Sequence, residues 1–131
     1  YELKPLKIYD AAKRLTSGMY MPGTTMVLSF HFKKPLPIGK GGMILTDDSL
    51  QVEYLKRSRY EGRSEGVSYH YDSIMEDGYN MYMTPEQAAR GLLLLSNHPE
   101  NFPDQIEDPD YRDLTEFPLF NKDWYGSPNN K

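Results

Sequence analysis

Residues 24–46 have the sequence TTMVLSFHFKKPLPIGKGGMILT, in which two apolar runs flank a stretch rich in turn residues. Residues 24–30 combine β-branched and apolar side chains over the length of a strand, and residues 43–46 form a shorter run of the same kind. Between them, residues 31–42 hold three lysines, two prolines and three glycines, a mixture that cannot sustain regular structure and lets backbone approach a ligand closely. The pattern predicts two strands joined by a loop that holds the candidate functional residues.

The flanking sequence predicts one more strand and a first helix. Residues 6–10 alternate enough to form a short strand that ends on Asp10, and residues 11–20 are typical of a turn or a short helical piece. A helix is expected to begin at residues 47–49 and to end before Gly62.

The clearest boundary in the chain is the start of a second helix. The run Thr84-Pro85-Glu86-Gln87 supplies a cap hydroxyl, a proline at the first helical position and a glutamine three residues after the cap. Leucines make this helix apolar over most of its circumference, so we expect it to be buried, with Gly91 permitting close packing, and to end before Pro99. Before it, residues 63–79 lack a clear period and are expected to form an active-site or interface loop.

The composition is typical of one soluble globular domain, or of part of one. The 131 residues include 38% apolar and 26% charged side chains and no cysteine, which suits a reducing cytoplasm. No apolar run approaches the roughly 18 residues that cross a bilayer. The first residue is Tyr1 rather than Met, so we expect an upstream stretch to be missing.

Charge is spread unevenly along the chain. Residues 1–98 carry 12 basic and 11 acidic side chains, whereas residues 99–131 carry 3 and 8. We therefore expect an acidic, proline-rich irregular extension over residues 99–131. The chain has no basic stripe of the kind that nucleic acid requires, and its three histidines are too scattered to indicate a metal site. His98 is expected to cap a helix end.

Four segments follow one another along the chain: Asp10-Ala11-Ala12 at a strand end, the hexapeptide Ser29 to Lys34, the Gly-x-Gly-Gly turn at 39–42, and the run from Gly78-Tyr79-Asn80 to Gly91-Leu92. In this order, they resemble segments of the DegT/DnrJ/EryC1/StrS sugar aminotransferase family. The resemblance covers residues 6 to about 96. It implies an α/β fold, namely part of the large domain of a fold-type-I aminotransferase that binds pyridoxal 5'-phosphate (PLP), with a mixed sheet and flanking helices. The family's second phosphate-binding segment and its C-terminal small domain are not matched, so the chain looks like a central slice of such an enzyme.

The resemblance also implies roles for individual residues. Lys34 would form the Schiff base with the PLP aldehyde and then move protons. Asp10, at the edge where open α/β sheets place their ligands, would pair with the pyridine nitrogen, and Ala12 would lie against one face of the ring. Ser29 would donate its hydroxyl to the cofactor phosphate. Asn80 would reach the phosphate from the neighbouring subunit, which implies a homodimer.

Each of these residues also has an ordinary structural interpretation. Lys33 is the rival of Lys34, and the family's spacing of five residues after Ser29 selects Lys34. Taken alone, Asp10 would be a turn or cap carboxylate, Ser29 a capping hydroxyl, Ala12 a packing residue and Asn80 a turn residue.

Three positions depart from the family pattern. Lys13 stands where the family has glutamine or histidine, Glu61 where it has histidine, and Tyr82 where it has arginine. The residues that contact the substrate therefore stay open. Related PLP-dependent sugar dehydratases carry histidine at the place of Lys34, and the lysine argues against that activity.

The resemblance implies an aminotransferase, which we expect in the cytoplasm because the chain has no cysteine. It would move an amino group from an amino-acid donor to a keto-sugar nucleotide through the Lys34 Schiff base. The alternative is a catalytically inactive remnant that acts as an oligomerisation or interaction module.

Overall fold

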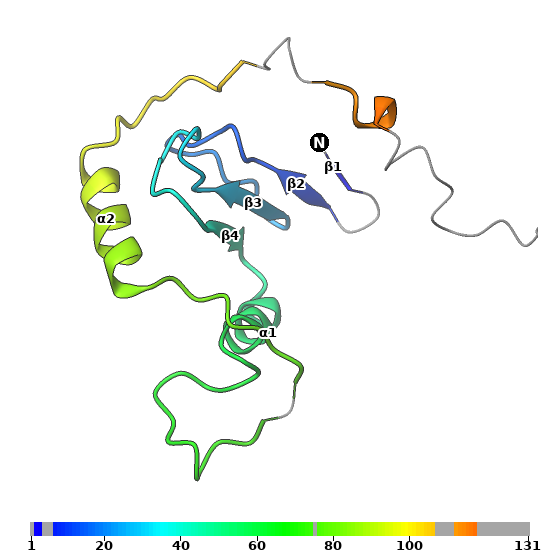
Figure 1. Ribbon diagram of the computed structural model, residues 1–131, viewed down its shortest axis with the longest axis vertical. Helices are drawn as coiled ribbons and strands as arrows, with labels where there is room; N and C mark the ends of the chain where they lie inside the picture. The colour runs from blue at the N-terminus through cyan, green and yellow to red at the C-terminus, as the bar shows by residue number, and fades with distance from the viewer. Residues whose placement is uncertain (1, 4–6, 75, 107–111, 118–131) are drawn as a thin grey trace, which may run out of the picture.

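A computed structural model of the chain describes residues 2–3, 7–74, 76–106 and 112–117. Four strands form one mixed sheet in sequence order (Figure 1): β1 Glu2–Leu3, β2 Ile8–Asp10, β3 Thr25–Ser29 and β4 Gly42–Thr46. Strands β2 and β3 are parallel, while β1–β2 and β3–β4 are antiparallel. The predicted strands are confirmed at β2, β3 and β4, and residues 11–20 form turns rather than a helical piece.

The parallel pairing places two strand ends at the same edge of the sheet. Asp10 is the last residue of β2 and stands opposite Val27, two residues before the end of β3 at Ser29. The amide of Ala11 extends the ladder by donating to the Val27 carbonyl over 2.9 Å. Strand β4 runs the other way, so its end at Thr46 lies at the opposite edge.

One face of the sheet is packed and the other is open. Met26 and Leu28 of β3 are buried with Ala11 on the packed face, where partly buried side chains from the 15–20 turns cover them. Val27 and Ile44, which are paired on the other face, are 39% and 45% exposed. The period of two along β3 thus separates a covered face from an uncovered one.

The connection between β3 and β4 has an apolar centre of its own. Phe30, Leu36 and Ile38 are buried together, and Leu15, Met83 and Leu94 pack against them. This loop therefore has a defined position although it contains no helix or strand.

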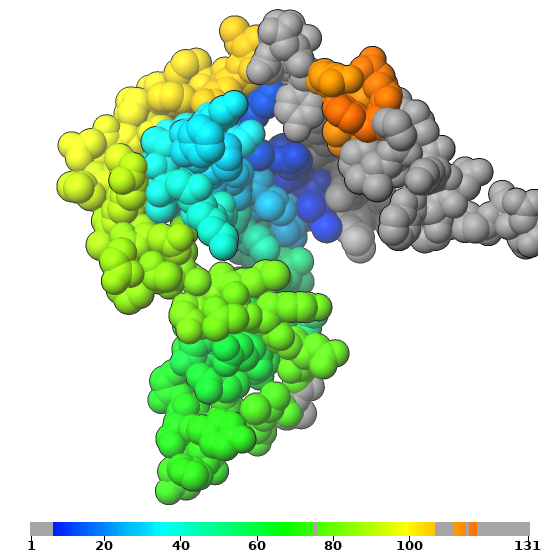
Figure 2. All heavy atoms as spheres, in the orientation of Figure 1, coloured from blue at the N-terminus to red at the C-terminus, as the bar shows by residue number. Residues whose placement is uncertain are grey.

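Helix α1 (Ser49–Arg59) begins where predicted, with Asp48 as its cap residue. The Asp48 carboxylate accepts hydrogen bonds from the Leu50 and Gln51 amides, which satisfies two of the free donors at the helix start. The predicted loop after α1 returns along the helix and is held to it by ion pairs, including Arg57 to Glu76. In Figure 2 the helix and this loop form a green arm that projects from the sheet.

Helix α2 (Pro85–Ser96) confirms the predicted capping box. Thr84 accepts from the Gln87 amide, and the Gln87 side chain accepts from the Thr84 amide. The prediction of a buried helix is wrong: of its described residues only Gly91 is buried, while Leu92 and Leu93 are 70% and 67% exposed. An all-round apolar surface needs partners on every side, and within the described part of the chain α2 packs only on the β3–β4 loop.

Candidate functional site

Two of the predicted site residues lie at one edge of the sheet, and a third lies in the loop that leaves this edge. Asp10 and Ser29 end the parallel strands β2 and β3, and Lys34 lies in the loop that leaves β3. Parallel strands present their carboxyl ends together, and that edge is where open α/β sheets bind ligands. The topology thus brings an acid and a hydroxyl to one edge, from which the loop that carries Lys34 departs.

Asp10 is exposed, and Ala12 follows it two residues later in the turn after β2. The Oδ1 atom of Asp10 accepts a hydrogen bond from the Ala12 amide over 2.9 Å, which fixes the carboxylate over the turn that follows β2. Asp10 therefore acts as a turn carboxylate, which is the structural role that the sequence leaves open for it. A carboxylate accepts at both oxygens, so this contact leaves Oδ2 for a further donor.

Ser29 has a comparable local contact. Its Oγ accepts from the His31 amide over 3.3 Å, a bond that turns the chain away from the sheet. A hydroxyl that accepts in this way still has its own proton to donate.

Lys34 and Lys33 differ in their surroundings. Lys33 is exposed, with its ammonium 5.9 Å from the centroid of the Phe32 ring. Lys34 is half-buried, its amide donates to the His31 carbonyl over 2.9 Å, and its side chain makes no hydrogen bond or ion pair with the described residues.

Helix α2 packs against the loop between β3 and β4, here called the Lys34 loop. Ile38 packs on Gly91, where a built Cβ would stand 2.7 Å from Ile38 Cδ1, and the Arg90 guanidinium donates to the Pro37 carbonyl over 3.4 Å. The close packing predicted at Gly91 is thereby confirmed, with the Lys34 loop as its partner.

Asn80 does not join the other site residues. It forms an isolated bridge with Tyr60, just after α1, and its Nδ2 donates to the Glu61 Oε1 atom over 2.9 Å. Helix α1 follows β4, whose end lies at the sheet edge opposite to Asp10 and Ser29. Within this chain, Asn80 is thus held on the projecting arm.

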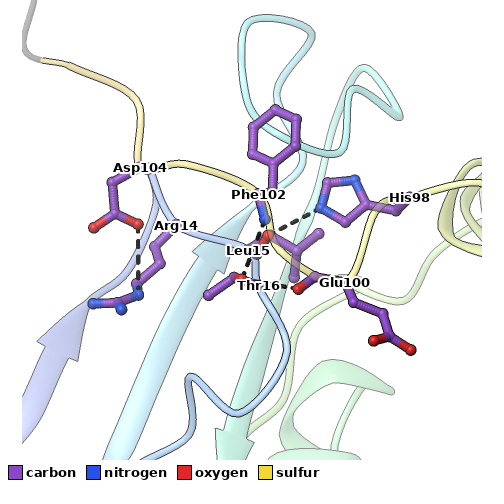
Figure 3. A network of polar contacts seen from close by, with 7 residues as sticks. All are labelled: Arg14, Leu15, Thr16, His98, Glu100, Phe102 and Asp104. Atoms are coloured by element: carbon purple, nitrogen blue, oxygen red, sulfur yellow. Dashed lines mark hydrogen bonds and ion pairs between the residues drawn. The ribbon is translucent and has the colours of Figure 1, made fainter.

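Residues 98–106, here called the return segment, lie against the turn that follows Ala12 (Figures 1 and 3). The Thr16 hydroxyl donates to the Glu100 carbonyl over 2.9 Å and accepts from the Phe102 amide over 3.3 Å. Nearby, Arg14 and Asp104 form an exposed ion pair at 3.5 Å. The sequence predicts only an irregular stretch here, whereas the structure gives it specific partners.

His98 also takes part in the contact between the return segment and the turn after Ala12. Its backbone amide closes α2 by donating to the Leu95 carbonyl, as expected of a helix end. Its Nε2 atom, however, lies 2.9 Å from the Leu15 carbonyl oxygen, and its ring packs on Phe102 with centroids 4.8 Å apart (Figure 3). The side chain therefore binds the turn after Ala12 rather than capping α2.

Sequence reasoning missed two residues that touch the predicted site segments. Glu61, seen only as a departure, holds Asn80 and adopts a positive φ of 61°. Gln105 donates from its amide to the Lys13 carbonyl and from its side chain to the Lys33 carbonyl. No local pattern reports either contact, because the partners are 19 and more residues apart in sequence.

The sequence profile of the DegT/DnrJ/EryC1/StrS aminotransferase family matches residues 16–107. The chain belongs to this family. The matched range includes Ser29, Lys34 and Asn80, while Asp10 and Ala12 lie before it. The family resemblance inferred from the four segments is confirmed.

Two individual proteins extend the comparison. The uncharacterized protein MJ1066 of Methanocaldococcus jannaschii is 35% identical over 77 residues, which is 53% of this chain and 20% of that protein. The structure of Helicobacter pylori PseC, an aminotransferase involved in the biosynthesis of pseudoaminic acid, matches with a TM-score of 0.60 and 26% identity. This match covers 70% of the chain and 26% of PseC.

The structural match confirms the predicted fold class. The mixed sheet with its helices is similar to part of a fold-type-I aminotransferase, and the chain spans about a quarter of PseC and a fifth of MJ1066. None of the described helices is both long enough and apolar enough to span a membrane. The division of the chain at residue 98 stays a prediction.

Proposed function

We propose that this chain carries the cofactor-binding centre of a PLP-dependent sugar aminotransferase, which moves an amino group from an amino acid to a keto-sugar nucleotide. Family membership supports this activity, as does the likeness to PseC. The observation that carries the proposal is the position of Lys34 in the loop that leaves the edge formed by Asp10 and Ser29, where the residue is half-buried and its amine is unpaired among the described residues.

The groups at this edge fit the polar parts of PLP. Asp10 has a carboxylate oxygen left to face the ring nitrogen, and a carboxylate there keeps that nitrogen protonated. Ser29 retains a hydroxyl proton for the phosphate. Lys34 would supply the amine for the aldehyde, and Ala12, two residues after Asp10, has a side chain small enough to lie against the ring.

When bound, PLP acts as an electron sink for the substrate's amino carbon. The chain's own task is then to place and move protons. Lys34 Nζ, once released by the incoming amino donor, would act as the general base and acid beside that carbon. Asp10 would act through charge alone, since it holds a proton on the ring nitrogen without giving one up.

The test is to locate the lysine that PLP modifies. The protein is incubated with PLP, the lysine adduct is reduced with borohydride, and the modified peptide is sequenced by mass spectrometry. We expect modification of Lys34, its loss in Lys34→Ala, and its retention in the matched control Lys33→Ala. Modification that persists in Lys34→Ala, or that maps to Lys33, would contradict the assignment.

We further propose a homodimer in which Asn80 binds the phosphate of the partner's PLP. The placement of Asn80 on the arm, away from the Lys34 edge of its own chain, supports this arrangement. The test mixes Lys34→Ala chains with Asn80→Ala chains. If Asn80 acts across the dimer, the mixture regains one intact site and PLP affinity returns; if Asn80 acts within its own chain, no intact site forms.

The exposed leucines of α2 favour a second candidate, an oligomerisation module without catalysis. Leu92, Leu93 and Leu95 present an apolar surface that the described part of the chain leaves uncovered. Light scattering with and without PLP separates the two functions. A multimer that shows no affinity for PLP supports the module, whereas a dimer that PLP stabilises supports the aminotransferase.

A further inference from the structure

Gln105 of the return segment is bonded to both segments that carry the proposed cofactor residues. Its backbone amide donates to the Lys13 carbonyl over 3.0 Å, and its side-chain Nε2 donates to the Lys33 carbonyl over 2.9 Å. Lys13 directly follows Ala12, and Lys33 directly precedes Lys34. One residue thus joins the turn after β2 to the loop that carries the lysine.

We propose that Gln105 is a positioning residue that sets where the Lys34 loop stands relative to the end of β2. The proposal rests on the function proposed above for Lys34. Among the described residues, Gln105 makes no hydrogen bond with the Lys34 side chain or with Asp10, so its effect would pass through the backbone of Lys33 and Lys13.

The other anchors of the loop show why this bond matters. On the far side of Lys34, Leu36 and Ile38 are buried and hold the loop against α2. On the near side, residues 31–33 are exposed, and the next buried residue is Phe30. The hydrogen bond from Gln105 to Lys33 is therefore the contact with the return segment that lies closest to Lys34 on its N-terminal side.

Three variants isolate the side-chain donor. Gln105→Glu keeps the size of the side chain but, ionised at neutral pH, it can only accept hydrogen bonds, and it would face a carbonyl oxygen. Gln105→Lys restores a donor at the same position. Ile106→Ala is the matched control, because Ile106 is the next residue and is 93% exposed.

The first readout is amide hydrogen exchange at Lys34 in the cofactor-free protein. The Lys34 amide is bonded to the His31 carbonyl, so its exchange reports opening of this loop. Loss of one hydrogen bond predicts exchange about twofold to tenfold faster in Gln105→Glu. We expect recovery in Gln105→Lys and no change in Ile106→Ala. Equal exchange in Gln105→Glu and the wild type would overturn the proposal.

The second readout is the rate at which subsaturating PLP is trapped on Lys34 by borohydride. Positioning predicts a severalfold slower rate in Gln105→Glu and recovery in Gln105→Lys. Faster exchange with an unchanged trapping rate would also overturn the proposal, since the bond would then be structural only. Because exchange is measured without PLP, a wild type that traps no PLP would refute the proposed function while the exchange data still decide whether Gln105 holds the loop.

Discussion

The Asp47 carboxylate connects the end of β4 to the turn that leads into β3. It follows β4 and accepts a hydrogen bond from the Gly23 amide over 2.9 Å, in the turn that leads into β3. This bond is the largest cause of a lowered pKa for Asp47, and the nearby Tyr20 hydroxyl lowers the pKa further. A carboxylate with a lowered pKa in the folded state stabilises the fold above its unfolded pKa, and that contribution disappears as the pH falls through the folded pKa.

We predict that Asp47→Asn lowers the free energy of unfolding at pH 6, and that the difference from wild type shrinks below about pH 4. Urea unfolding at several pH values measures it. Asp77→Asn, which removes an exposed carboxylate, serves as the control. A difference that stays constant down to pH 3 would show that the charge of Asp47 is not responsible.

At the scale of elements, α2 contacts the Lys34 loop closely at Gly91. Alanine at Gly91 would gain about 1 kcal/mol of helix propensity, but its Cβ would stand 2.7 Å from Cδ1 of the buried Ile38. Overpacking of this kind costs about 1–3 kcal/mol. The two effects on the free energy of unfolding have opposite signs. Ile38→Val removes Cδ1, the carbon that would clash with the new Cβ.

We predict that Gly91→Ala is neutral or destabilising by up to about 2 kcal/mol in the wild type, but stabilising by up to about 1 kcal/mol in Ile38→Val. Denaturant unfolding of the four proteins gives a coupling energy. Strictly additive effects would mean that Ile38 moves aside freely and that α2 does not fix the loop.

The two helices show which features of an element the local sequence pattern predicts. The caps at Asp48 and Thr84 were predictable, because a cap side chain bonds amides two or three residues away. The burial of α2 was not, since apolar character states only that a surface favours burial and leaves open whether a partner is within reach.

At the scale of the whole molecule, the return segment binds the turn after Ala12, which is more than 80 residues earlier in the sequence. We predict that Thr16→Val, which keeps the shape of the side chain but removes two hydrogen bonds, lowers the free energy of unfolding by about 1–3 kcal/mol. Arg14→Ala breaks only an exposed ion pair in the same contact and should cost less than about 1 kcal/mol. Thermal or urea unfolding compares the two, and equal losses would contradict the assignment of the anchor to Thr16.

The sequence by itself determined strands β2, β3 and β4, both helix starts, the family and the order of Asp10, Ser29 and Lys34 along the chain, but not β1. These depend on neighbours a few residues apart, or on motifs whose order survives in one dimension. Only the tertiary structure decided that β2 and β3 are parallel, so that Asp10 and Ser29 share an edge, and that Asn80 stands apart from it. It alone revealed Gln105 between Lys13 and Lys33, because hydrogen bonds between distant segments depend on how the chain returns in space.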